Sequence, residues 1–319
     1  MAARVSELPL ERPGVVIMPI VGWICPIERT EVPFNHFDTC VARSGRPAFN
    51  PTLARIMTRK IVGDVRHAGL QLTATRTYGC PRATFLDVAY DYYVDPTRLV
   101  AMARGTILHG VFAREADEAL WYTESNDAVR MNLHGTVFGH EIDLMCDAVR
   151  RDLGEVVDFK FPLDWSVRYR EQQHGRCKIE HQIQLNLARI VLGQQEWARR
   201  EGYDPGNVLL TCWDFALGQG GRGGPEPLVA AHMTEEEMEA VRPFGGEWTV
   251  ADIVANHVAM LEAARSRELP RAGTEQDEFA ASLPLVGETQ MGSSKCTKYC
   301  ELEPLCSNLV RRFGRPVVQ

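Results

Sequence analysis

Four short segments carry residues that can act together in catalysis. In chain order they contain His109, Asp143, the pair Asp158 and Lys160, and Gln184. Asp158 and Lys160 are two residues apart on a predicted strand, so both side chains point to the same face. Asp143 belongs to the strand predicted before it, and we expect the two strands to be neighbours. Two carboxylates at strand ends can bind Mg²⁺, and a histidine ligand such as His109 also suits Mn²⁺.

The remaining groups fit hydrolysis of a phosphodiester. A lysine beside a metal ion can orient or deprotonate bound water, or offset charge on the phosphate. Gln184, on a predicted helix, can position water or a phosphate oxygen. Lys160 and Asp158 lie in an apolar stretch, and a charged pair in a strand of this kind needs a reason. Each residue alone is a weak signal, whereas the ordered combination is specific.

The cysteines indicate a second metal centre. Three of the nine cysteines cluster near the C-terminus, as Cys296, Cys300 and Cys306. Three thiolates need a fourth ligand to close a zinc site or a four-iron cluster, and Cys80 is the best candidate. The spacing alone is compatible with zinc and with iron–sulfur. Without a secretory signal, cysteines are more often metal ligands or buried apolar groups than disulfides.

In the order of these motifs the sequence resembles the RecB-like branch of the PD-(D/E)XK nuclease superfamily. Within that branch it is most similar to the iron–sulfur exonucleases associated with CRISPR systems and their phage relatives. The resemblance covers roughly residues 70–310, and its matching positions are Cys80-Pro81-Arg82, Arg104-Gly105 to His109, Asp143, Asp158, Lys160, Gln184-Leu185, Cys296, Cys300 and Cys306.

The resemblance implies a nuclease core, in which a central mixed β-sheet is flanked by helices, followed by a C-terminal iron–sulfur region. It implies that His109, Asp143 and Asp158 bind Mg²⁺ or Mn²⁺, that Lys160 acts in catalysis, and that Gln184 places the substrate. It further implies a [4Fe–4S] cluster on the four cysteines, and DNA contacts by the arginines at 82 and 104. The expected activity is a DNA exonuclease acting on single strands or duplex ends in recombination, replication, repair or CRISPR adaptation.

Two departures from the family pattern stand out. Three residues separate Cys296 from Cys300, where the family usually has two. The tyrosine expected four residues after Gln184 is Ala188. The first change bears on the type of cluster, whereas the second weakens the expected substrate contact and leaves the ligands of the divalent metal intact.

Other functions remain open at this level. A non-catalytic DNA-binding or assembly subunit would keep the fold but carry a broken metal set, and a redox or iron sensor would not need Asp158 and Lys160. Cys25, His36 and Cys40 could begin a small zinc site with His67 as a distant fourth ligand; the alternative is an ordinary extension with buried thiols. Further basic residues could follow a DNA backbone or form an ordinary solvated face: Arg150, Arg151, Arg168, Arg170, Arg176 and Lys178.

The elements that must position these residues follow from periodicity. Helices are predicted from Asn50, from Asp95 to about Leu120, over 178–200 and over 248–267. A meander of strands is predicted at 129–133, 136–146 and 155–161, and a strand pair at 207–215 and 228–232. This order indicates an α/β fold with a mixed sheet. We expect an N-terminal extension at 1–65 and a nuclease domain at 66–319.

Composition is that of an ordinary globular protein. The 319 residues are 45% hydrophobic and 24% charged, with a net charge of −7. The acidic balance does not by itself indicate nucleic-acid binding, although local patches matter more than the sum. No apolar run approaches the roughly 18 residues of a membrane span, and the N-terminus lacks a continuous apolar signal region, so we expect a cytoplasmic protein.

Overall fold

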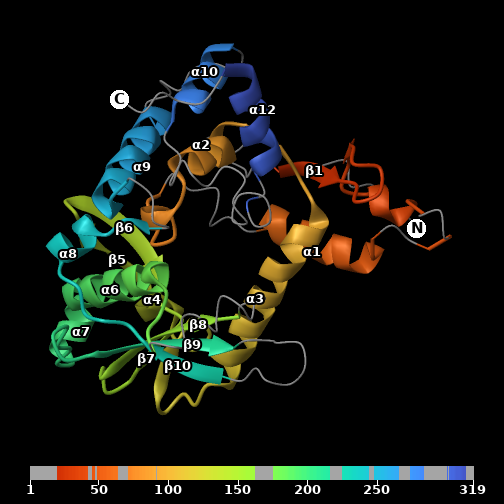
Figure 1. The fold of residues 1–319 in the computed structure, drawn as a ribbon. Coiled ribbons are helices and arrows are strands. Elements are labelled where there is room, and N and C mark those ends of the chain that lie inside the picture. Colours follow the sequence, from red (N-terminus) through yellow and green to blue (C-terminus); the bar gives the residue numbers. More distant parts are fainter. Residues whose placement is uncertain are drawn as a thin grey trace.

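The computed structural model describes residues 20–41, 45–46, 49–63, 71–90, 92–161, 175–215, 225–243, 248–265, 274–283, 300 and 302–313. They form an α/β fold with mixed sheets, which confirms the predicted class (Figure 1). The strands are β1 (Ile20–Ile24), β2 (Glu31–Val32), β3 (Tyr92–Val94), β4 (Trp121–Thr123), β5 (Asn132–Val137), β6 (His140–Met145), β7 (Ala148–Arg150), β8 (Glu155–Lys160), β9 (Leu209–Phe215) and β10 (Pro225–Val229). The helices are α1 (Pro51–Gly63), α2 (Pro81–Ala89), α3 (Pro96–Glu115), α4 (Ala128–Met131), α6 (Ile179–Gln194), α7 (Glu196–Arg200), α8 (Glu235–Ala240), α9 (Val250–Arg265), α10 (Thr274–Ser282) and α12 (Glu303–Phe313), with short 3₁₀ turns η1 (His36–Asp38) and η3 (Arg76–Tyr78).

The largest sheet has the strand order β10-β9-β8-β7-β4. Strands β8 and β9 are parallel, whereas the other pairs in this sheet are antiparallel. Parallel neighbours need a crossover connection, and α6 lies between β8 and β9 in the chain. The buried side chains of Ile183, Leu187 and Val191 recur every four residues, which gives α6 the apolar stripe that it packs on the sheet.

Helix α3 packs beside the end of β8. Asp95 caps the helix by accepting a hydrogen bond from the backbone N–H of Thr97. Further along α3, the ring of Phe112 lies 5.2 Å from that of Phe159, centroid to centroid. Alternate residues of a strand point to opposite faces, so Phe159 faces α3 while Asp158 and Lys160 face α6.

Strands β5 and β6 form a separate two-stranded hairpin. Phe138 and Gly139 join them with φ angles of 54° and 75°. Two successive positive φ values are typical of a tight I′ turn, which matches the twist of the flanking strands. The prediction of one continuous strand at 136–146 is therefore wrong, and so is the meander. The predicted strand start at 129–133 is also wrong in part, since α4 occupies its first residues.

The described residues form two hydrophobic cores, which meet at α9, where Leu261 belongs to one and Met260 to the other. One joins the five-stranded sheet, the β5–β6 hairpin, α6 and α9. The other joins β1 and α1 with α2, α10 and α12, so it combines segments from both ends of the sequence (Figure 1). Strand β1 also pairs in parallel with β3. The described part of the predicted extension at 1–65 thus shares a sheet and a core with later segments.

No helix in the described part of the chain is long and apolar enough to cross a membrane.

Candidate active site

The end of β8 brings a carboxylate, an amine and an amide together. Lys160 Nζ lies 2.8 Å from Asp158 Oδ1 and 3.1 Å from Gln184 Oε1 on α6. The Tyr78 hydroxyl, from η3, donates to the same Gln184 oxygen at 3.4 Å. The structure therefore joins three of the predicted residues and adds Tyr78, which the sequence analysis did not single out.

Asp147 provides the second carboxylate of this cluster. Its Oδ2 lies 3.3 Å from His109 Nδ1 and accepts a hydrogen bond of 2.7 Å from the backbone N–H of Phe159. Strand β7 begins at the next residue, and its Ala148 pairs with Val157 on β8. This register places Asp147 next to Asp158, with His109 reaching the pair from α3.

The structure places Asp143 elsewhere, contrary to the prediction that its strand lies beside Asp158. Asp143 is on β6, which pairs with β5, and its carboxylate pairs with His134 directly opposite. Its backbone N–H donates to Leu72 O at 2.9 Å. The strand that pairs with β8 is β7, so Asp147 occupies the position that the sequence analysis assigned to Asp143.

The two carboxylates of the cluster have opposite electrostatic environments. Burial raises the pKa of Asp158 to about 6, and the charge of Asp147 adds to this, although Lys160 acts in the opposite direction. Burial also acts to raise the pKa of Asp147, but the hydrogen bond and charge of His109, together with Lys160, hold it below its usual range. Lys160 is buried too, yet the two carboxylates raise its pKa. Paired carboxylates with diverging pKa values are typical of functional sites.

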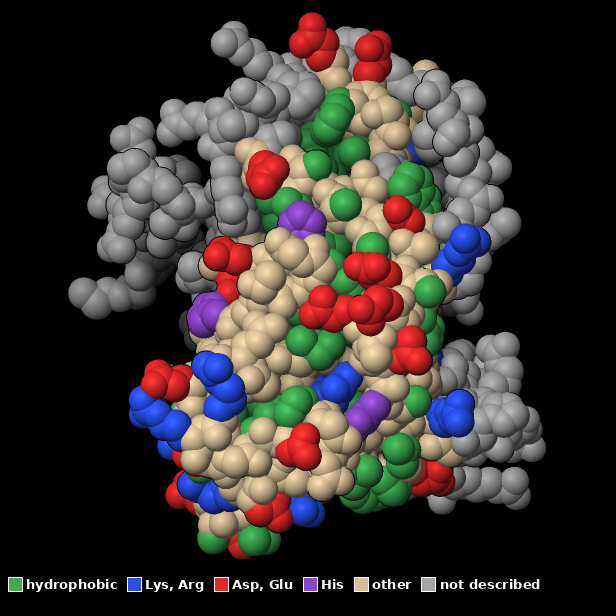
Figure 2. All heavy atoms as spheres, turned by 90° about the vertical axis from the view of Figure 1, so that its left-hand side faces the viewer, with side chains coloured by type: hydrophobic (Ala, Val, Ile, Leu, Met, Phe, Trp, Pro, Cys, Tyr) green, Lys and Arg blue, Asp and Glu red, His purple; other side chains and the backbone are tan. Residues whose placement is uncertain are grey.

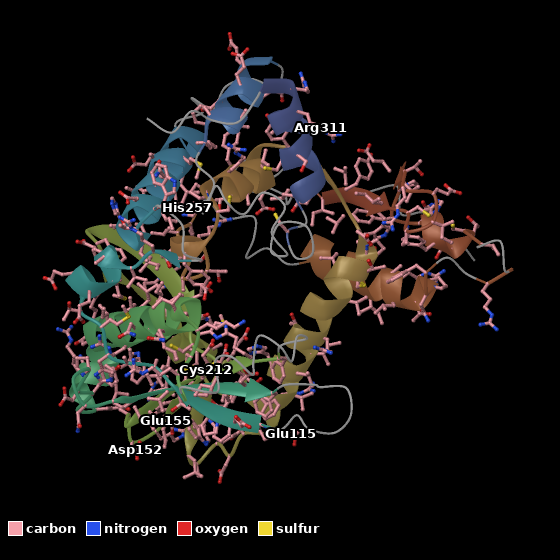
Figure 3. All side chains as sticks on the ribbon, viewed as in Figure 1. Glu115, Asp152, Glu155, Cys212, His257 and Arg311 are labelled. Carbon is pink, nitrogen blue, oxygen red and sulfur yellow. The ribbon has the colours of Figure 1, made fainter. Side chains whose placement is uncertain are left out.

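Strand β9 lines the same face. Cys212 pairs in register with Asp158, and its Sγ lies 3.9 Å from Asp158 Oδ2 and 3.7 Å from His181 Nδ1 (Figure 3). The buried Asp214 pairs in register with Lys160. Neither residue was predicted to take part. Cys212 was predicted to be an inert core residue, and it is fully buried as expected.

Arg82 does not fit its predicted role as a DNA contact. Its side chain is fully buried, and the guanidinium donates to Ala281 O at 2.7 Å and to Leu283 O at 2.6 Å. A guanidinium enclosed in this way cannot reach a DNA backbone, so we correct its role to a structural one. Arg104 remains near the cluster, where it donates to Phe161 O at 3.3 Å.

The predicted thiolate centre lies by the second core. Cys80 is the N-cap residue of α2, Cys306 is on α12, and these two helices pack together. The sulfur of Cys306 lies 3.8 Å from Arg82 Nη1. Cys300 packs against the same core as Cys306, while Cys296 lies outside the described residues. Cys80, Cys300 and Cys306 are all half-buried, but among the described residues their sulfurs do not form a group of three with the spacing of a metal site.

Within the described residues, two members of the predicted basic face have partners inside the molecule. Arg150 pairs with Asp152 and Glu155, and Arg151 lies over the ring of Tyr122. Arg168 and Arg170 lie outside the described residues.

Comparisons with known proteins do not assign a family. No protein-family model matches the chain, and no curated protein matches it. Four chains of solved structures match. Among them is one described as the crystal structure of SSO0001, which is 14% identical with a TM-score of 0.33 and covers 75% of this chain and 86% of that chain. A likeness of this size carries no argument about function.

Proposed function

We propose that the protein is a metal-dependent nuclease that hydrolyses phosphodiester bonds of DNA, as in the PD-(D/E)XK nucleases that its motifs resemble. The observation that carries the proposal is the convergence of His109, Asp147, Asp158 and Lys160 near the end of β8, the central strand of the five-stranded sheet. These residues come from α3, from the start of β7 and from β8, so the fold itself assembles them. Burying two carboxylates and an amine costs free energy of folding, so a cluster of this kind is expected to serve a function.

The donor types suit a hard divalent cation, although the ligand atoms of His109, Asp147 and Asp158 do not all lie within 4.8 Å of one another. Asp147 and Asp158 would hold Mg²⁺ or Mn²⁺ through carboxylate oxygens, and His109 would add an imidazole that suits Mn²⁺. When bound, such an ion would polarise the phosphate and lower the pKa of a coordinated water.

The other residues act as positioned polar groups. Lys160, kept protonated by the two carboxylates, is placed to neutralise charge on a phosphate or to orient the attacking water. Gln184 is held by Lys160 and by the hydroxyl of Tyr78, so its amide has a defined orientation. The family usually has a tyrosine four residues after this glutamine, where this chain has Ala188. Tyr78 instead brings a phenol hydroxyl to Gln184.

The substrate of the proposal is single-stranded DNA or a duplex end. The face in Figure 2 mixes acidic and basic side chains and has an acidic group in its middle, and α8 contributes Glu235, Glu236 and Glu237 to the acidic charge. A DNA backbone would be repelled there. We therefore place the DNA at the opposite side of the cluster, near Arg104, which reaches the end of β8 from α3.

The test is digestion of end-labelled linear DNA beside circular single-stranded DNA, with Mn²⁺ or Mg²⁺. We expect stepwise loss of the linear substrates, with circles resistant, and no cleavage by Lys160→Ala or Asp158→Asn. Equal activity of folded Lys160→Ala and the unchanged protein would contradict the site. DNA binding without any cleavage would point instead to an assembly subunit.

The proposal includes a metal centre on Cys80, Cys296, Cys300 and Cys306. Protein purified without oxygen should be brown and contain about four irons per chain if the centre is a [4Fe–4S] cluster. Colourless protein with zinc on these thiols would identify the zinc alternative. Loss of the metal from Cys80→Ser but not from Cys177→Ser is the expected pattern.

A further inference from the structure

Three side chains of metal-ligating types meet near the end of β1, on elements separate from the candidate active site. Cys25 follows β1 directly, His36 begins η1, and Cys40 follows two residues after η1 ends. One potential ligand atom from each of the three lies within 4.8 Å of the others. Among the described residues, no other three histidine, cysteine or acidic side chains bring their ligand atoms this close together.

The geometry of the two sulfurs fits a shared ion. The Sγ atoms of Cys25 and Cys40 are 4.0 Å apart. With Zn–S bonds of about 2.3 Å, the edge of a tetrahedron is about 3.8 Å long. A disulfide would require about 2.05 Å. The sulfurs are therefore placed as two corners of a tetrahedral site.

The histidine supplies a third, independent observation. Nε2 of His36 is buried and has no hydrogen-bond partner among the described residues. A buried polar atom without a partner is costly, and native structures rarely leave one unexplained. A metal ion bound between this nitrogen and the two sulfurs would satisfy it.

Local backbone structure fixes the three ligands. The N–H of Cys40 donates to His36 O at 3.0 Å, so one turn brings both side chains to the same side. The N–H of Cys25 donates to Thr30 O at 2.9 Å, which closes the β1–β2 turn beneath them. The four-residue separation of His36 and Cys40 falls within the spacing found in zinc sites.

We propose that Cys25, His36 and Cys40 bind a zinc ion, with one further ligand completing its coordination. His67, predicted as that ligand, lies outside the described residues. The ion ties the end of β1 to η1, next to the buried side chains of Trp23 and Phe37. Strand β2 has only two residues, so few backbone hydrogen bonds hold the segment from β1 to η1. A bound metal ion would add to the folding free energy of this segment. The proposal does not depend on nuclease activity.

The experiment measures metal by mass spectrometry in protein purified without added metal or chelator, followed by replacement with Co²⁺. We expect zinc in the unchanged protein, one equivalent less in Cys40→Ser, and no loss in the control Cys177→Ser, whose buried thiol instead donates to Leu228 O. Zinc at these ligands should also persist in Cys80→Ser, which separates this site from the C-terminal thiols.

A conservative variant guards against misfolding. His36→Cys replaces the imidazole by a third thiolate, so it should retain cobalt and increase the sulfur-to-cobalt charge-transfer absorbance about 1.5-fold. Unchanged zinc in Cys40→Ser, or an unchanged cobalt spectrum in His36→Cys, would overturn the site. Two thiols missing from a titration of denatured, unreduced protein would show a Cys25–Cys40 disulfide and would also overturn it.

Discussion

Asp147 and Asp143 are four residues apart, yet the structure gives them different neighbours. Asp147 contacts His109 and lies beside Asp158, whereas Asp143 pairs with His134 on a separate hairpin. Both are partly exposed aspartates with a histidine partner. They therefore form a matched pair for testing which one belongs to the site.

We expect Asp147→Asn to lower the rate of DNA cleavage by about 10²-fold or more, the loss typical of removing a positioned catalytic group. Asparagine keeps an oxygen that can accept from the N–H of Phe159, so the fold should survive. Asp143→Asn should leave the rate within a few-fold of the unchanged protein. Initial rates at saturating Mn²⁺ measure both. Loss of activity in Asp143→Asn alone would contradict our assignment.

The sequence was a good guide to some of these residues and a poor one to others. Asp158, Lys160 and Gln184 stand in local patterns, and the structure brings them together. Asp147 was missed because its place depends on β7, a three-residue strand defined by pairing with β8 and β4. A turn at Phe138-Gly139 pairs the strand of Asp143 with the strand before it, which leaves Asp147 as the aspartate beside β8. The sequence Phe-Gly lacks the Asn-Gly or Asp-Gly signal of such turns, so the turn was not predicted.

At the scale of elements, the β5–β6 hairpin packs on α6 through a close approach at Gly135. A Cβ added there would lie 2.7 Å from Val191 Cγ1 and 2.4 Å from Gln194 Oε1. The Gln194 side chain hydrogen-bonds both the N–H and the C=O of Thr136, each at 2.8 Å. The absence of a side chain at Gly135 therefore lets Gln194 of α6 reach the backbone of Thr136 on β5.

We expect Gly135→Ala to lower the free energy of unfolding by about 1–3 kcal/mol, because the added methyl group displaces Gln194 and Val191. Gly110→Ala is the control, since a Cβ at this α3 position meets open space. That change should be neutral or stabilise by up to about 1 kcal/mol, as alanine favours helix. Urea denaturation compares the two. Equal stability of both variants would show that the hairpin can move away from α6 without cost.

Helix α9 carries a buried histidine that makes its packing sensitive to pH. His257 Nε2 and Thr84 Oγ1 of α2 share a hydrogen bond of 2.9 Å (Figure 3). Burial, with the charge of Arg76, lowers the pKa of His257 to about 3. In the unfolded chain the pKa is near 6.5. The contribution to stability is therefore complete above about pH 6.5 and is lost as the pH falls toward 3.

The expected result is a free energy of unfolding that decreases by up to about 1.4 kcal/mol per pH unit below pH 6.5. His257→Gln removes the titrating group, so its stability should change less over pH 6.5 to 4.5. Chemical denaturation across this range is the measurement, with His140→Gln on β6 as control. If His257→Gln and the unchanged protein follow the same pH curve, another group causes the dependence.

At the scale of the whole molecule, Arg82 joins segments about 200 residues apart. Its guanidinium holds the carbonyl groups of Ala281 and Leu283 at the end of α10, and it also contacts Cys306 on α12. Its burial could not be foreseen from the motif Cys80-Pro81-Arg82, because the partners come from remote sequence. The α/β class was predictable from periodicity, whereas this long-range closure was not.

We expect Arg82→Gln to destabilise the protein by about 2–4 kcal/mol, because buried carbonyl groups lose charge-assisted hydrogen bonds. Thermal melting and limited proteolysis of the C-terminal helices measure the effect. The exposed Arg311→Gln on α12 should melt like the unchanged protein. Arg82→Gln that melts normally but binds DNA weakly would restore the DNA-contact role that we have corrected.

The composition of the two cores has a consequence for how the chain folds as it is synthesised. The core around the five-stranded sheet draws on Leu72 to Leu261 and can close before the last helices leave the ribosome. The other core needs Trp23 and Met57 from the start of the chain and Met260 to Leu309 from its end. At about 5–20 residues per second, the early apolar residues must wait roughly 10–60 s for these partners. During that interval β1 can already pair with β2 and β3, but the apolar side chains that α10 and α12 add to this core are still missing, so early metal binding at Cys25, His36 and Cys40 would help to keep the nascent chain free of aggregation.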